Sequence, residues 1–173
     1  MIIRLQGTRI SLRYRRIKDF RFTLILRQNE ILSEYLNKTS LITHLGFQIK
    51  SWFRNDHDFV VLNNEQRRIG TISLYNLLPS ENSCEWGRWI CTGNARENVE
   101  SMMVLLKFAF EVLQLDSVFC CTKCDNVRIS GFHSRLPYSS REKIVRQNTY
   151  FFKDTLTKED WAEFKLTVGR FFI

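Results

Sequence analysis

Four residues suited to phosphate binding stand close together before a long apolar segment: Gly93, Asn94, Arg96 and Asn98. The segment that follows has the spacing of a helix, which places these residues at a helix start. Backbone N–H groups are unpaired there and the helix dipole is positive, so the junction is suited to receiving a phosphate. A capped loop that binds no ligand is the alternative.

The cysteines are a second group of residues that could form a chemical site, either disulfides or a metal site. The five cysteines are odd in number and fit no disulfide framework, and three of them lie within "CCTKC". Cys121 and Cys124 make a single C-x-x-C, whereas a structural zinc site needs further ligands. We therefore expect structural or incidental thiols and no metal. The set is Cys84, Cys91, Cys120, Cys121 and Cys124.

Length and composition indicate one globular domain over residues 1–173, since 44% of the residues are hydrophobic and no glycine- or proline-rich linker divides the chain. No apolar run approaches about twenty residues, so no membrane insertion is expected. The start "MIIRLQGTRISLRYRR" lacks the apolar core and cleavage site of a signal peptide. The sequence thus predicts a cytoplasmic protein.

The formal net charge of +8 favours a partner with negative charge. The basic residues are scattered, and there is no zinc-finger or RNP-type motif, so we expect no nucleic acid partner. Coenzyme A and nucleotide sugars both carry a pyrophosphate and fit this charge as well. A solvated basic surface with no such partner is the other interpretation.

The elements that would position these residues alternate between strand and helix. Arginine alternates with apolar residues at 8–14, as in a half-buried strand. Two short helices are expected within 18–36, with Asp19 as a cap. The remaining predictions are a helix at 43–55, an antiparallel meander of strands at 58–63, 67–77 and 83–91, a buried helix at 99–113, a strand at 116–123 parallel to the one before it, a short helix at 125–136 capped by Asp125 or Asn126, a strand at 148–154 and a final helix capped by Thr157.

This order of elements resembles the GCN5-related N-acetyltransferase (GNAT) family. The resemblance runs from "GTRISLR" through "RRIGTISL", "CEWGRWI", "LLKFAFEVLQLDSV" and "DNVRISGFHSRLPY" to "EDW". The segments "LRQNEILSEYLNKTS" and "SCEWG" are most similar to members that act on nucleotide-linked amino sugars, as in pseudaminic acid synthesis. The resemblance implies an α/β (α+β) fold with a central mixed, mostly antiparallel twisted sheet of about seven strands flanked by helices. It also implies acetyl-CoA as the cofactor.

In the family, the loop and helix start after the fourth strand bind the pyrophosphate of acetyl-CoA. That pattern falls here on Gly93, Arg96 and Asn98, with Arg96 at a position where the family has glycine. Loss of the glycine shifts phosphate binding from close backbone approach to side chains, so a retained but altered site is expected. The resemblance places the other cofactor contacts at Trp89, Ile90, Asn94, Val99, Asn126 and Phe132.

Acetyl transfer to an amine needs a neutral nucleophile, a stabilised oxyanion and a proton for the leaving thiolate. Glu85 stands where several family members have a carboxylate that takes the ammonium proton. A strand glutamate paired with Arg88 is the alternative. His133 falls at the position of the family tyrosine that protonates the thiolate, and Pro137 and Tyr138 replace the usual Gly-Phe ending. A histidine that only packs or is solvated is the alternative.

The resemblance also implies residues for substrate recognition. Arg27 matches a basic residue that contacts the nucleotide in the sugar enzymes, and Asn29, Tyr75, Trp86 and Arg88 would line the sugar side. The expected function is transfer of acetyl to the amine of a nucleotide-linked deoxyamino sugar. A protein N-terminal or lysine acetyltransferase and a non-catalytic acyl-CoA-binding module are the alternatives. A homodimer is also considered.

Overall fold

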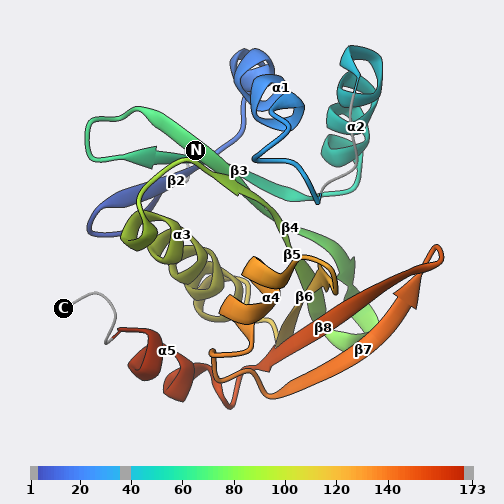
Figure 1. The fold of residues 1–173 in the computed structure, drawn as a ribbon. Helices are drawn as coiled ribbons and strands as arrows, with labels where there is room; N and C mark the ends of the chain where they lie inside the picture. The colour runs from blue at the N-terminus through green and yellow to red at the C-terminus, as the bar shows by residue number, and fades with distance from the viewer. Residues whose placement is uncertain (1–3, 36–39, 170–173) are drawn as a thin grey trace. The chain divides into compact units, whose positions relative to one another are not determined.

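The computed structural model describes residues 4–35 and 40–169. Eight strands form one mixed sheet, hydrogen-bonded in the order β1-β2-β3-β4-β5-β6-β8-β7 (Figure 1). The chain forms two compact units. Unit 1 contains the chain up to Tyr75 together with Arg88–Leu105, and unit 2 contains Asn76–Gly87 and the chain from Leu106 onwards. Strands β4 (Arg68–Leu78) and β5 (Ser83–Cys91) contribute residues to both units.

The strands of unit 1 follow their apolar patterns. β1 (Arg4–Gln6) pairs antiparallel with β2 (Ile10–Tyr14), β2 with β3 (His57–Asn63), and β3 with β4. The centre of β3 is an unbroken apolar run, as expected for a strand covered on both faces. The core of this unit includes Ile10, Leu12, Phe59, Val60, Val61, Ile72 and Leu74.

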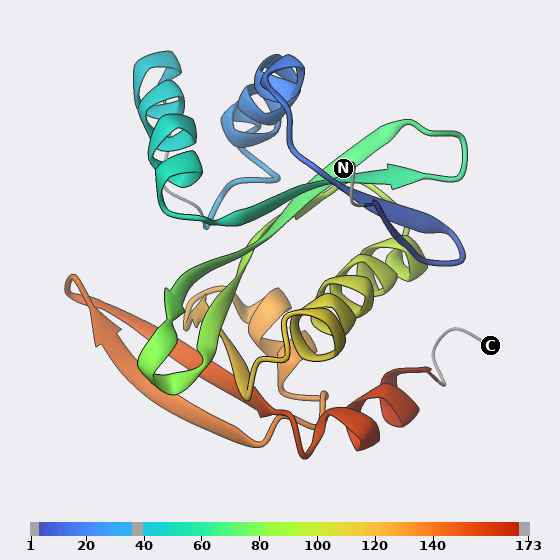
Figure 2. The same ribbon diagram turned by 180° about the vertical axis from the view of Figure 1, so that it is seen from behind.

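Helices α1 (Phe20–Gln28) and α2 (Leu41–Phe53) lie side by side in unit 1 (Figures 1 and 2). The buried His44 of α2 joins them, because its Nε2 lies 2.9 Å from the Thr23 hydroxyl. Ser40 begins α2 by accepting a hydrogen bond from the Thr43 amide. The second short helix predicted within 18–36 is wrong for the described residues, because 30–35 form turns after α1, and residue 36 lies outside the described chain.

Asp19 occupies the position before α1 but does not cap that helix with its side chain, so the predicted cap is wrong. Its carboxylate instead accepts hydrogen bonds from the Arg16 amide and from the guanidinium of Arg13 at 2.7 and 2.8 Å. The Arg13 contact connects β2 to the start of α1. A buried carboxylate satisfied in this way stabilises the strand-to-helix connection rather than the helix end.

Helix α3 (Ala95–Lys107) begins four residues earlier than the predicted 99–113 and continues into unit 2 as wider π-helical turns over Phe108–Val112. Its apolar residues Met102 and Leu105 are fully buried in unit 1. The early start matters for function, because the polar loop then supplies the cap of the helix itself.

Unit 2 contains the predicted parallel pair. The first residues of β5 pair parallel with β6 (Ser117–Lys123), as a strand-helix-strand crossover requires. β6 pairs antiparallel with β8 (Thr149–Thr157), and β8 pairs with β7 (Ser140–Arg146). Helix α4 (Val127–His133) connects β6 to β7, and α5 (Trp161–Gly169) ends the described chain. Among the described residues, no helix is both long and apolar enough to cross a membrane.

Strand β7 is the main element that the sequence pattern missed. Its residues are mostly exposed on both faces, so the sequence "SREKIVR" lacks the apolar alternation of a half-buried strand. The Thr157 hydroxyl accepts a hydrogen bond from the Asp160 amide at 3.4 Å, just before α5 begins at Trp161. Thr157 thus organises the turn that enters the helix instead of capping its first residue.

Candidate active site

The polar loop before α3 closes on itself through a capping box. Asn94 Oδ1 accepts a hydrogen bond from the Glu97 amide at 3.0 Å, and Glu97 Oε2 accepts one from the Asn94 amide at 2.9 Å. Gly93 packs closely on this carboxylate, since a Cβ there would lie 2.8 Å from Glu97 Oε2 and would displace that side chain. Asn94 and Gly93 therefore shape the helix start, and Glu97 already neutralises part of its positive end.

Two side chains at this helix start remain suited to a phosphate. Arg96 is exposed on the first turn of α3. Asn98 Oδ1 is buried and, within the described part of the chain, has no hydrogen-bond partner. Val99 is half-buried beside them. The donors at this helix start are the guanidinium of Arg96 and the Nδ2 group of Asn98, whereas the unpaired Oδ1 of Asn98 is an acceptor and would not bind a phosphate.

Trp89 and Ile90 of β5 precede this loop in unit 1. The Trp89 indole donates to the Ser101 hydroxyl at 3.1 Å, and that hydroxyl donates to the Asn98 carbonyl at 2.7 Å. Trp89 therefore anchors β5 to the first turns of α3. The Ile90 side chain is buried, so any contact that it makes with a cofactor would come from its backbone.

Glu85 lies on β5 in unit 2 and is buried, with 5% of its side chain exposed. Arg146 of β7 donates to both carboxylate oxygens at 3.2 and 3.1 Å, and Asn76 donates to Oε2 at 3.0 Å. Burial and the neighbouring Glu85 carboxylate raise the pKa of the Cys121 thiol to about 12. A buried carboxylate held by one half-exposed arginine has the position expected of a proton acceptor.

Glu85 is salt-bridged, as the alternative interpretation expected, but its suggested partner Arg88 is wrong. Arg88 pairs with Asp56 at 2.7 Å and with Asp58 at 3.2 Å in unit 1. The actual partner of Glu85, Arg146, is on the strand that the sequence pattern missed.

His133 ends α4 and is buried in unit 2. Its Nδ1 lies 3.3 Å from Cys120 Sγ and 3.6 Å from Asp154 Oδ2, and its ring centroid lies 5.5 Å from that of the buried Trp86. In the described residues its Nε2 has no hydrogen-bond partner. Nε2 is thus the nitrogen that remains to give a proton to another group. The Trp86 side chain is 1% exposed and packs in this core.

Helix α4 carries the two remaining cofactor candidates. Asn126 caps the helix, as predicted, by accepting a hydrogen bond from the Ile129 amide at 3.2 Å. Phe132 is half-buried, and its ring centroid lies 5.5 Å from that of His133. Asn126 therefore fixes the start of the helix that positions His133.

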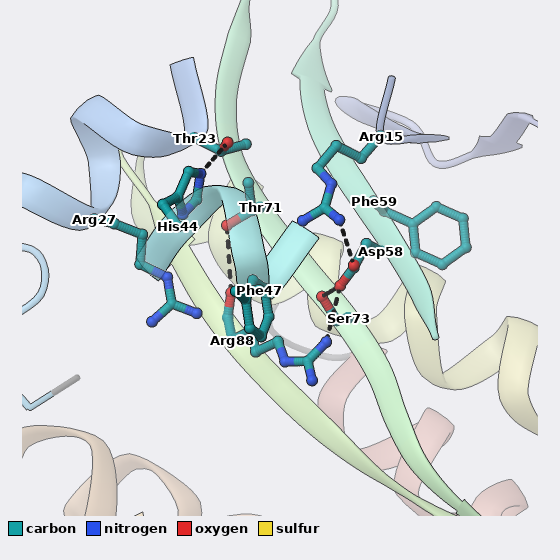
Figure 3. A pocket seen from close by; sticks show the side chains of 10 residues that line it. All are labelled: Arg15, Thr23, Arg27, His44, Phe47, Asp58, Phe59, Thr71, Ser73 and Arg88. Carbon is teal, nitrogen blue, oxygen red and sulfur yellow. Dashed lines mark hydrogen bonds and ion pairs between the residues drawn. The ribbon is translucent and has the colours of Figure 1, made fainter. Parts of the chain in front are cut away.

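A pocket in unit 1 is lined by three arginines, two of which lie at one carboxylate (Figure 3). Asp58 pairs with Arg15 at 2.9 Å and with Arg88 at 3.2 Å, and it accepts hydrogen bonds from two serine hydroxyls. Burial raises the pKa of Asp58, but the charges of Arg15 and Arg88 and these hydrogen bonds outweigh burial and lower it below its ordinary value. The pocket is lined by Arg15, Thr23, Arg27, His44, Phe47, Asp58, Phe59, Thr71, Ser73 and Arg88.

Arg27 is the lining arginine whose charge is not compensated. Among the described residues it forms no ion pair, and its nearest aromatic partner is the Phe47 ring at 5.8 Å. Burial and the neighbouring Arg88 lower the pKa of Arg27. Burial together with the charges of Arg27 and Arg15 lowers the pKa of His44 to about 4. An uncompensated guanidinium beside two paired ones makes the pocket attractive to an anion.

The structure brings the predicted substrate residues together only in part. The Arg88 guanidinium lies 3.9 Å from the centroid of the Tyr75 ring and 4.6 Å from that of Phe47, so Tyr75 contacts one of the arginines that line the pocket. Asn29 instead organises the turn after α1 by accepting a hydrogen bond from the Leu32 amide at 3.0 Å. The sequence did not identify Arg15, His44 or Asp58 as pocket residues. For Arg15 and Asp58 the reason is that a buried ion pair contains the same residue types as a solvated one.

Comparisons with known proteins agree with this fold. Residues 9–137 match the family model described as "Acetyltransferase (GNAT) domain". The chain therefore belongs to the GNAT family of acyl-CoA-dependent N-acetyltransferases, which confirms the family and fold predicted from the sequence. A comparison with curated proteins finds no match.

Two solved structures illustrate the likeness. One is described as "Apo FdhC- a nucleotide-linked sugar GNAT"; it is 22% identical, each chain is 99% covered, and the TM-score is 0.80. The other is spermidine N-acetyltransferase from Vibrio cholerae in complex with CoA and spermine. It is 15% identical with a TM-score of 0.76, over 90% of this chain and 99% of that one. At these identities the likeness shows the fold alone.

Proposed function

We propose that the chain transfers acetyl from acetyl-CoA to the amine of a nucleotide-linked deoxyamino sugar in the cytoplasm. The observation that carries the proposal is the pocket of unit 1, which is lined by Arg15, Arg27 and Arg88, with Arg15 and Arg88 paired to Asp58 and Arg27 in no ion pair among the described residues. Arg27 brings a charge with no carboxylate partner among the described residues, and a substrate phosphate would supply that partner.

The same pocket argues against a polyamine substrate. A polyamine is a cation and would be repelled by the positive charge of Arg27, which forms no ion pair among the described residues. The likeness to a spermidine enzyme is one of fold, whereas the likeness to a nucleotide-linked sugar enzyme agrees with the charge of the pocket. A peptide substrate would not require a half-buried arginine that has no ion-pair partner among the described residues.

The residues of the α3 start would hold the cofactor. The guanidinium of Arg96 and the Nδ2 group of Asn98 are hydrogen-bond donors and would bind the pyrophosphate. When bound, acetyl-CoA supplies a thioester carbonyl as the electrophile and a thiolate as the leaving group. The side chains of this chain then need to do two things, which are to accept a proton from the amine and to return one to the sulfur.

We assign these two roles to residues of unit 2. Glu85 accepts the proton of the substrate ammonium, directly or through water, so that the neutral amine can form the new C–N bond. Arg146 orients its carboxylate through both oxygens. His133 gives its Nε2 proton to the departing sulfur as the C–S bond breaks, because Nδ1 already faces Cys120 and Asp154.

The test is a comparison of Michaelis constants for the two substrates. Arg27→Ala should raise the constant for the nucleotide sugar about 10- to 150-fold, the value of one charge-assisted hydrogen bond of about 1.5–3 kcal/mol. The constant for acetyl-CoA should stay near the wild-type value. Arg96→Ala should show the reverse pattern. Arg21→Ala, an exposed arginine on the same helix, is the matched control.

Three results would reject this substrate class. One is equal turnover of a free amino sugar and its nucleotide-linked form. Another is preferred turnover of spermidine or of a peptide amine. The last is an unchanged Michaelis constant for the nucleotide sugar in Arg27→Ala.

A further inference from the structure

Three side chains that offer metal ligands converge in the interior of unit 2. Cys120 comes from β6, His133 from the end of α4 and Asp154 from β8, and all three are nearly inaccessible, with exposed fractions of 4%, 3% and 1%. One ligand atom from each lies within 4.8 Å of the other two. Thiolate, imidazole and carboxylate are the three ligand types that zinc takes from proteins.

The contacts of His133 distinguish a binding site from a nucleophilic relay. In a relay, one imidazole nitrogen faces the nucleophile and the other faces the orienting carboxylate. Here the same nitrogen, Nδ1, lies 3.3 Å from Cys120 Sγ and 3.6 Å from Asp154 Oδ2. The three atoms therefore point toward a common place, which is the arrangement of ligands around an ion.

The spacing of these atoms also fits a small ion. With bonds of about 2.3 Å to sulfur and about 2.0–2.1 Å to nitrogen and oxygen, a tetrahedral centre separates S and N by about 3.5 Å and N and O by about 3.4 Å. The observed separations are 3.3 and 3.6 Å. We propose that Cys120, His133 and Asp154 bind one Zn²⁺-type divalent ion.

The surroundings prepare the carboxylate for this role. Arg141 Nε lies 3.2 Å from Asp154 Oδ1, and its Nη2 donates to the Ser130 carbonyl and hydroxyl at 3.2 and 2.8 Å. This holds one carboxylate oxygen in place, as partners of metal ligands commonly do. The other oxygen, Oδ2, is buried and has no hydrogen-bond partner among the described residues. The Thr122 hydroxyl, 3.4 Å from His133 Nδ1, or a water would complete the coordination.

Binding exchanges a proton for the ion. Burial and the Asp154 charge raise the pKa of the Cys120 thiol, so without an ion the thiol keeps its proton. The ion takes the thiolate as a ligand, and that one proton leaves to solvent. The ion also takes Nδ1 of His133 as a ligand and fixes the position of its ring. Zn²⁺ should therefore inhibit acetyl transfer, a consequence that rests on the proposed acid role of His133, whereas the binding itself does not.

Cobalt titration of the chelator-treated protein tests the site. Co²⁺ should bind one ion per chain, with a thiolate-to-cobalt charge-transfer band and visible bands of tetrahedral intensity. Cys120→Ser should abolish the charge-transfer band. Arg141→Ala, which removes the partner of Asp154, should weaken affinity about 10- to 100-fold, and Asp154→Asn, which removes a ligand, should weaken it at least as much. Cys121→Ser is the matched control, because it removes the adjacent thiol and leaves the three ligands in place. Circular dichroism of each variant establishes that it is folded.

The outcomes separate the inference from the proposed function. A wild-type protein with no charge-transfer band at millimolar Co²⁺ overturns the site. So does a band that survives in Cys120→Ser but disappears in Cys121→Ser, which would place the ion at the C-x-x-C. One bound ion with the expected spectrum and no inhibition by Zn²⁺ supports the site and rejects the acid role of His133.

Discussion

Asp58→Asn should cost more stability than any single surface charge, because Asp58 is the shared partner of Arg15 and Arg88 in the arginine pocket. The side chains of Arg15 and Asp58 are only 7% and 8% exposed, so water would not replace the lost interaction. Arg88 keeps Asp56 at 2.7 Å, and only Arg15 is left without a carboxylate. The expected loss is that of one broken buried pair, about 3–5 kcal/mol of unfolding free energy.

Urea denaturation followed by tryptophan fluorescence measures this loss, and a thermal scan should show a midpoint lower by about 6–20 °C. Glu65→Gln is the control, since its pair with Arg67 is 62% and 77% exposed and should contribute about 0–1 kcal/mol. Arg15→Met added to Asp58→Asn should recover part of the loss by removing the uncompensated cation. A loss no larger than that of Glu65→Gln would refute the reasoning.

The same variant carries a pH signature. Because the pKa of Asp58 is lowered in the folded state, its stabilisation is complete above the unfolded carboxyl pKa of about 3.9 and is lost as the pH falls through the folded value. Asp58→Asn should therefore lose less stability than the wild type on acidification below about pH 4.

Three further predictions concern the site residues. Glu85→Gln should lower turnover about 10²–10⁴-fold with little change in cofactor affinity, and wild-type turnover across pH would reject the base role. His133→Ala should lower turnover about 10²-fold and His133→Tyr should recover much of it, whereas a change confined to the Michaelis constant would indicate packing or substrate binding. The pKa of His44 is lowered to about 4 in the folded state. The unfolding free energy should therefore fall by roughly 3 kcal/mol as the pH is lowered from about 6.5 to about 4. His44→Gln should flatten the pH dependence of the unfolding free energy over this window, and an unchanged slope would contradict the assignment.

The sequence was sufficient to predict the strands and helices whose own apolar pattern is strong. The parallel pair of β5 and β6 follows from two apolar strands joined by a buried helix, and both strands and α3 were found. Strand β7 was missed because it is stabilised by pairing with β8 and not by a buried face of its own. Missing that strand also hid Arg146, and with it the true partner of Glu85.

The candidate site was predictable where a local pattern exists and not where distant charges meet. The helix-start loop at Gly93–Val99 could be found from adjacent residues alone. Asp58 pairs with an arginine of β5 thirty positions away, and a sequence gives no sign that both are buried. Cys120, His133 and Asp154 likewise come from three separate elements, so the sequence directed attention to the neighbouring C-x-x-C instead.

Arg88 adopts a left-handed backbone conformation with φ of 50°, a region that favours glycine and asparagine. Its guanidinium meanwhile pairs with Asp56 and Asp58 and stacks on the Tyr75 ring. Position 88 thus has two opposed requirements. Its backbone conformation favours glycine or asparagine, and its ion pairs with Asp56 and Asp58 favour arginine. Glycine would relieve the first and lose the second, and valine or isoleucine would fail both. We expect a saturation library at this position to retain arginine, with asparagine and glycine as folded but less stable survivors.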